Sequence, residues 1–326
     1  MNGNAVSDDL MTADVKGANG DQTGEWLLYL MGRPPLKDYL GYLRKQAKDG
    51  VSLSQSLLAE EWRAANMHIK DIVADEYGWA NDAPITPLPE HLLPLREQFL
   101  DSPVYQQRSC PIGTSEIGIV ELDRLVVWQR HINLSHVERL TQQFGPSPSE
   151  ETVFKLCLPL DPPKPPLQWI KAGRNTFVFV SPSNDLRCLD SMVVEPAQLC
   201  NFPPATKVIA GVAGVTVGFG SNFLHVIRLE GRMVLNNGSH RAYALRKVGI
   251  THVPCIINHV AGREELRVVG TDDDLACNPD LYLKHPRPSL FKDYFDPLLQ
   301  KTFEIRRKLR QIRVRIKVEE FDVPAL

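Results

Sequence analysis

The chain has 326 residues, of which 43% are hydrophobic and 23% are charged, values that are ordinary for a soluble globular protein. The formal net charge is −2, so there is no global attraction to nucleic acid, and such a partner would need a local basic patch. No run of the sequence approaches 18 apolar residues, which argues against a membrane-spanning helix and against a membrane partner.

Residues 1–24 are rich in Gly, Asn, Asp and Thr and have no apolar periodicity, so we expect a disordered tail. This segment has no hydrophobic signal-peptide core, and the six cysteines form no C-x-x-C pair. We therefore predict a protein of the reducing cytoplasm. Cys157 and Cys255 lie within apolar runs and are predicted to be buried free thiols.

Residues 25–103 are predicted to form a small helical unit and a Pro-rich segment. A helical stretch is expected to begin at residues 26–30, and Pro35 is well placed to start a helix over residues 36–44. Apolar residues at helical spacing predict a longer helix over residues 53–73. The prolines of residues 80–103 indicate a linker or an arm lying close to the core.

Residues 104–326 are predicted to form the main domain. Val137, Leu140 and Phe144 share one helical face and predict a helix over residues 131–144. A β-rich insertion is expected at about residues 146–206. The insertion is predicted to contain strands at residues 176–180, 186–189 and 192–195. A Val/Gly-rich β segment is predicted to follow it at residues 208–219.

The most informative stretch lies between residues 224 and 257. Two apolar runs flank Glu230-Gly231, which predicts a two-residue hairpin. A tight turn at Gly238, a helix capped by Ser239 and ending at Gly249, and a short buried strand at 253–257 follow.

His240 and Arg241 fall in the first turn of this helix. The positive end of the helix dipole and the free N–H groups there make a favourable site for an anion, and phosphate is the commonest such anion. The alternative is a helix cap whose His and Arg face solvent.

This unit resembles the core of the ParB/sulfiredoxin-like superfamily, which includes a free serine kinase. In that superfamily a Gly-x-x-Arg or Gly-x-His-Arg box opens a helix beneath the phosphates of a nucleotide, and Gly238, Ser239, His240 and Arg241 match the box. Residues 120–130 resemble the opening strand of the superfamily, with Gln129 as the polar residue that faces the nucleotide.

The resemblance implies an α+β fold with a ParB/sulfiredoxin-like core, preceded here by the helical unit and interrupted by the β-rich insertion. It implies that ATP, ADP or CTP binds with Mg²⁺ at Gln129 and residues 238–241. His240 would donate to phosphate or act as a catalytic acid or base.

The sequence also departs from the superfamily pattern. Ser239 stands where sulfiredoxin needs a cysteine, so repair of sulfinic acid is not expected. Asn237 and Gln129 replace the two carboxylates of the serine kinase, and an amide cannot take a proton from a hydroxyl as a carboxylate can. No helix-turn-helix follows the core, so DNA binding in the ParB manner is not expected.

Three other features leave two interpretations open. Residues 312–318 alternate apolar and basic side chains, which suits either a phosphate backbone or an edge strand protected by charge. Residues 272–274 are consecutive aspartates that could hold Mg²⁺, although a solvated loop or helix cap is the commoner role, and no metal site is predicted. Trp128 and Tyr243 either stack on a base or belong to the core.

Two functions follow. The first is a cytoplasmic enzyme that binds a nucleotide or a phosphorylated small molecule and performs phosphoryl transfer or nucleotide hydrolysis. The second is a non-catalytic module that senses such a ligand or associates with a protein partner. The absence of carboxylates at positions 129 and 237 favours the second.

Overall fold

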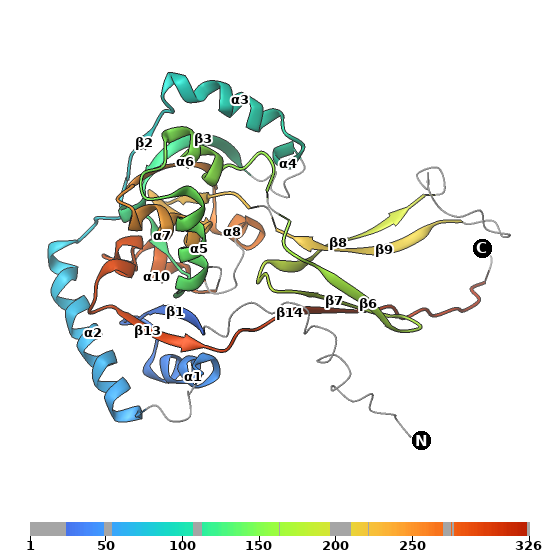
Figure 1. Ribbon diagram of the computed structural model, residues 1–326, viewed down its shortest axis with the longest axis horizontal. Helices are drawn as coiled ribbons and strands as arrows, with labels where there is room; N and C mark the ends of the chain where they lie inside the picture. Colours follow the sequence, from blue (N-terminus) through green and yellow to red (C-terminus); the bar gives the residue numbers. More distant parts are fainter. Residues whose placement is uncertain are drawn as a thin grey trace.

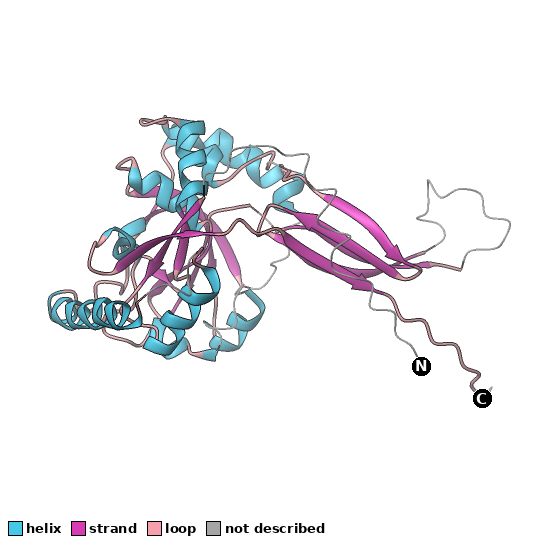
Figure 2. Ribbon diagram, turned by 60° about the horizontal axis from the view of Figure 1, so that its bottom comes forward, coloured by secondary structure: helices cyan, strands magenta, loops and turns pink. Residues whose placement is uncertain are grey.

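The computed structural model describes residues 24–48, 54–106, 113–162, 164–195, 210–220, 222–269, 275 and 277–324. These residues form an α+β protein in which a compact body of helices and sheets carries a long projection of β-strands (Figures 1 and 2). None of the described helices is both long and apolar enough to cross a bilayer.

A six-stranded mixed sheet lies at the centre of the body, with strand order β2-β3-β12-β10-β11-β4. The hairpin β10–β11 turns at Glu230 and Gly231, both at positive φ, as predicted. β12 then runs parallel to β10 and antiparallel to β3. The six strands are β2 (Ile85–Thr86), β3 (Thr114–Glu121), β4 (Val126–Val127), β10 (His225–Leu229), β11 (Arg232–Asn237) and β12 (His252–His259).

The two faces of this sheet bury separate apolar clusters. Val226 and Leu235 contribute to the larger cluster, whereas their neighbours Ile227 and Val234 contribute to the smaller one, because successive side chains of a strand point to opposite faces. Helices α5 (Leu134–Phe144), α6 (Glu150–Cys157) and α7 (Ser239–Lys247) cover the face of the larger cluster, and α8 (Arg263–Val269) and α10 (Pro279–Leu283) the other.

The predicted helical stretch over residues 26–30 is wrong, because this segment is strand β1 (Glu25–Leu30). β1 is the middle strand of a second sheet, between β13 (Gln300–Ile305) and β5 (His131–Asn133). Four consecutive residues of β1 are buried, so its apolar run is that of a strand covered on both faces. The N-terminal unit is therefore not all helical.

The other two predicted helices are present as α1 (Leu36–Gln46) and α2 (Gln55–Asp75). The Pro-rich segment is not a bare linker. It contributes β2, which pairs with β3, and helices α3 (Leu93–Asp101) and α4 (Pro103–Gln106). Phe99 of α3 is fully buried, so this segment lies against the core. Short 3-10 helices complete the body as η3 (Glu90–Leu92), η4 (Leu122–Arg124) and η6 (Phe291–Phe295).

The projection, called the β-arm below, contains a three-stranded sheet of order β14-β7-β6 and a two-stranded ribbon β8–β9 (Figure 1). The strands predicted within the expected insertion lie here, as β7 and β8. The first part of the insertion does not, because α6 packs in the body with Phe154 and Cys157 fully buried. The strands are β6 (Gln168–Gly173), β7 (Thr176–Ser181), β8 (Leu186–Val194), β9 (Val212–Phe219) and β14 (Arg310–Arg315).

Candidate functional site

The tight turn before α7 is formed by Gly238, which has a φ of 95°. A Cβ at this position would lie 3.0 Å from the Cα of Leu224, so both the left-handed conformation and the close approach favour glycine. Gly238 is also the N-cap, since the N–H of Ala242 donates to its carbonyl at 2.9 Å. The predicted cap by Ser239 is therefore wrong, and the Ser239 side chain serves another contact.

The structure brings Ser239 and Gln129 together, as expected for two residues of one site. The buried Ser239 hydroxyl donates to Gln129 Oε1 at 3.2 Å. Gln129 Nε2 donates to the carbonyl of His131 at 2.7 Å, and the Tyr294 hydroxyl donates to the Gln129 carbonyl. Both ends of the Gln129 amide are thus occupied within the protein.

His240 lies against the start of α5. Its Nε2 accepts the backbone N–H of Asn133 at 3.0 Å, and its ring meets that of His136 edge-on with centroids 5.4 Å apart. Burial lowers the pKa of His240 to about 3, helped by the nearby His136 and His131. The imidazole is therefore neutral at physiological pH and, in this arrangement, poorly suited to be a general acid or base near neutrality.

Arg241 is buried and binds backbone carbonyls. Its Nη1 donates to the carbonyls of Leu156 at 3.1 Å, Cys157 at 3.5 Å and Asn222. Leu156 and Cys157 end α6, where carbonyls lack intrahelical partners and a cation is favourable. Burial lowers the pKa of Arg241 to about 10, so the guanidinium stays charged and joins α6 to the segment that precedes β10.

One part of the predicted anion site remains available. The backbone N–H groups of Ser239, His240 and Arg241 have no acceptor among the described residues. The first turn of α7 therefore keeps the donors that could bind an anion, while the side chains of His240 and Arg241 are engaged elsewhere.

The partners of these residues were not evident from the sequence. Asn133 caps α5 by accepting the N–H of His136 at 2.8 Å. An Asn before an apolar-periodic run is a recognised helix-start signal that would have moved the predicted start from residue 131 to 134. The carbonyls bound by Arg241 carry no such signal, since every residue has one.

Tyr243 belongs to the core, where it is buried and stacked on Phe295 with centroids 4.5 Å apart. Trp128 packs against the smaller apolar cluster. Cys157 and Cys255 are buried free thiols, as predicted. The aspartates at 272–274 lie outside the described residues.

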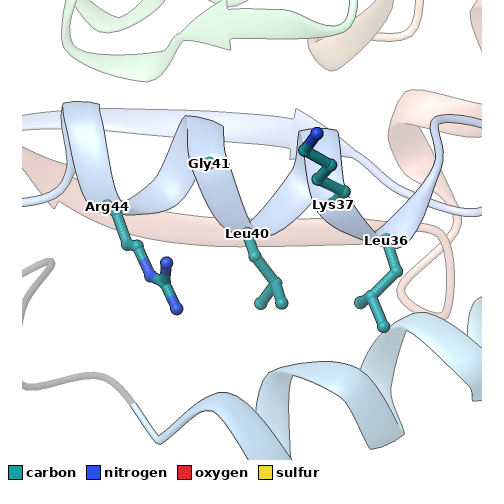
Figure 3. A pocket seen from close by; sticks show the side chains of 5 residues that line it. All are labelled: Leu36, Lys37, Leu40, Gly41 and Arg44. Carbon is teal, nitrogen blue, oxygen red and sulfur yellow. The ribbon is translucent and has the colours of Figure 1, made fainter.

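The described residues also line a cavity of about 470 Å³ beside α1 (Figure 3). Leu36 and Leu40 give it an apolar wall, and Lys37, Gly41 and Arg44 complete the lining. None of the residues predicted to bind a nucleotide lines it, and its lining includes no carboxylate or imidazole for acid–base chemistry.

Comparison of the chain with protein-family models, with curated proteins and with solved structures found no match.

Proposed function

We propose that the protein is a cytoplasmic, non-catalytic binding module whose partner docks on the β-arm. One observation carries this proposal. The β14-β7-β6 sheet has a largely apolar face on which Trp169, Phe179 and Ile312 form one cross-strand row, and Lys171, Phe177 and Val314 form the next. None of these side chains is fully buried, and Trp169 is 62% exposed.

An exposed apolar patch of this kind is characteristic of interaction surfaces. The ribbon of the β-arm adds exposed apolar side chains at Leu189, Met192 and Val193. Strand β6 is exposed along its whole length. The β-arm therefore offers both apolar side chains and sheet edges to a partner.

The candidate site supports a binding role over an enzymatic one. His240 and Arg241, the two side chains expected to act on phosphate, bind the backbone of the body instead. Gln129 and Asn237 supply amides where phosphoryl transfer would need a base.

We also propose that the six-stranded sheet and α7 are a ParB/sulfiredoxin-like core. The order of hairpin β10–β11, glycine turn, α7 and returning strand β12 supports this assignment. In such a core the box of residues 238–241 would act mainly as a structural joint, and the β-arm would be the element added for binding.

Affinity capture with purified chain tests the binding role. Trp169→Ser with Ile170→Ser removes two exposed apolar side chains of β6, and Leu57→Ser with Met67→Ser removes two from α2 as a matched control. We expect a partner from extracts of expressing cells to be captured by the wild type and by the α2 control. The β6 variant should not capture it. Binding of the purified partner should follow the same order. Equal capture by all three proteins would contradict the proposal.

A second candidate is binding of ATP, ADP or CTP with Mg²⁺ at the first turn of α7, favoured by the three unbonded N–H groups of residues 239–241. Calorimetric titration with each nucleotide, and with inorganic phosphate as a simpler anion, tests it. If the titration gives no heat and the nucleotide at millimolar concentration gives no thermal shift, this candidate is excluded. Hydrolysis of the nucleotide in the same samples would restore an enzymatic role.

A further inference from the structure

The chain segment after β14 is an extended strand-like stretch with no strand partner among the described residues. Residues 316–324 lie outside any described helix or strand, and Phe321 and Val323 are 81% and 72% exposed. In an extended chain alternate residues share a face. Phe321 and Val323 therefore lie on one face of this segment, and Glu320 and Asp322 on the other.

Strand β14 has the complementary pattern. It forms one edge of its sheet, so its outer backbone edge is unpaired in the ladder. Ile312 and Val314 point to the apolar face with Phe179 and Phe177, whereas Arg313 and Arg315 point to the opposite face. Both arginines are exposed, and neither has a carboxylate partner among the described residues.

We propose that residues 320–324 of one copy of this chain add as an antiparallel strand to the β14 edge of a second copy. This inference rests on the proposed binding role of the β-arm. One register satisfies both faces: Asp322 opposite Arg313, Glu320 opposite Arg315, Phe321 opposite Val314 and Val323 opposite Ile312. A slip by one residue places carboxylates against the apolar side chains, so the alternation specifies the register.

The segment does not reach its own β14. In the register proposed above, residues 316–319 would form the turn of a hairpin within one chain, and none of these four residues is in a turn. Instead, the N–H of Ile316 donates to the carbonyl of Asn175 at 2.9 Å, which continues the direction of β14. The chain then runs away from the sheet (Figure 2), where a second copy can meet it.

The choice of a second copy over another partner follows from charge and pattern. The chain carries both halves of the contact, a basic sheet edge with an apolar face and an acidic segment with an apolar face. Strand addition to a sheet edge is a recurrent mode of protein recognition in which backbone hydrogen bonds supply affinity and alternate side chains supply specificity.

Sedimentation equilibrium over about 1–100 μM protein tests the proposal, at low salt where the ion pairs are least screened. We expect the mean mass of the wild type to rise above the 36.7 kDa of one chain. Removal of residues 318–326 should hold the mass at one chain. Arg313→Glu with Arg315→Glu, and Glu320→Arg with Asp322→Arg, should each weaken association at least tenfold.

Mixing the two charge-reversed proteins should restore association, because the new glutamates at positions 313 and 315 of one protein can pair with the new arginines at positions 320 and 322 of the other. Lys247→Glu with Lys284→Glu, two exposed lysines of the body, is the matched control and should associate as the wild type does. For the register, Val314→Cys mixed with Phe321→Cys should form a disulfide between copies, and Val314→Cys mixed with Asp322→Cys should not.

A wild type that stays at one chain at all concentrations overturns the proposal, as does association that survives removal of residues 318–326. If that truncated chain still binds the partner that the β6 variant loses, the β-arm binds a different protein and only this inference fails. If the wild type stays monomeric and Arg313→Glu with Arg315→Glu abolishes binding of a fluorescein-labelled oligonucleotide, the partner is a nucleic acid, and the proposal also fails.

Discussion

The start of α7 and the β-arm both place arginines beside apolar side chains, but they differ in what those arginines contact. Arg241 is buried and binds three backbone carbonyls of the body. Arg313 and Arg315 are exposed on an edge strand with no carboxylate partner among the described residues. A buried arginine bonded to the backbone of the body indicates a structural role, whereas exposed arginines on an edge strand with an apolar face indicate a surface that receives a partner.

This difference separates stability from binding. Substitutions at the start of α7 should change the free energy of unfolding, because they leave buried polar groups without partners. Substitutions on the β-arm should leave that free energy almost unchanged and alter association. The following expectations test this contrast, from the largest effect to the smallest.

Arg241→Met should reduce the free energy of unfolding by about 1.5–3 kcal/mol, the range for hydrogen bonds that involve a charged group. The methionine fills part of the space but leaves the carbonyls of Leu156 and Asn222 without this donor, whereas the Cys157 carbonyl still accepts the N–H of Leu224 at 2.8 Å. Urea denaturation measures the change, with Lys247→Met on the exposed face of α7 as a control. A loss below about 1 kcal/mol would be typical of a surface substitution and would remove the structural role assigned to Arg241.

Gly238→Ala should cost about 1–3 kcal/mol, the range for holding a non-glycine residue in an unfavourable backbone conformation. The new Cβ would also lie 3.0 Å from the Cα of Leu224, which is backbone and cannot move aside cheaply. Gly249→Ala is a useful comparison, since Gly249 also has a positive φ of 89° but has open space at the Cβ position. Equal losses at both positions would mean that the approach to Leu224 adds no cost.

Acidification should destabilise the protein through His240. Its pKa falls from an ordinary 6.5 to about 3 on folding, so between these values the unfolded chain binds a proton that the folded chain does not. Stability is therefore complete above pH 6.5 and decreases as the pH falls toward 3. From pH 7 to 5 the loss attributable to this one group is about 1–2 kcal/mol.

Urea denaturation at pH 7 and pH 5 measures this loss, and His240→Asn removes the titrating group while leaving an acceptor. The variant should lose less stability than the wild type over the same pH interval. An identical loss in both proteins would assign the pH dependence to other groups, such as His136, whose pKa is also lowered by burial.

The elements that the sequence predicted correctly are those with local signals. Glu230-Gly231 marks the β10–β11 turn, and Gly238 and Gly249 mark the two ends of the α7 region. β1 was misassigned because its structure depends on pairing with β13, about 270 residues away in the chain, and not on its own periodicity. The box residues 238–241 were located correctly as the start of a helix. The acceptors of Arg241 are backbone carbonyls. Because every residue has one, the sequence could not predict which of them Arg241 binds.

The C-terminal residues also show that local patterns predict a strand but not its partners. Alternation predicted a strand at 312–318, and the structure has β14 at residues 310–315, at the edge of its sheet. This position agrees with the interpretation of an edge strand. The sequence did not reveal that the other strands of this sheet are β7 and β6, because these lie about 130 residues or more earlier. The apolar face exists only once the three strands are assembled.

Trp169→Ser should change the free energy of unfolding by less than about 1 kcal/mol, the value of a cross-strand side-chain pair. Trp169 is 62% exposed on an edge strand and faces Phe179 across the pair, so little apolar area returns to water when it is removed. Phe154→Ala is the contrasting variant, since Phe154 is fully buried in α6, and it should cost about 3–5 kcal/mol. If Trp169→Ser instead destabilised the chain as much as Phe154→Ala, the apolar face would be part of the folded core, and its exposure could no longer support a binding role. A small loss in stability together with a loss of partner binding would assign Trp169 to the interface. The loss of binding could then not be due to unfolding and would reflect the contacts that Trp169 makes with the partner.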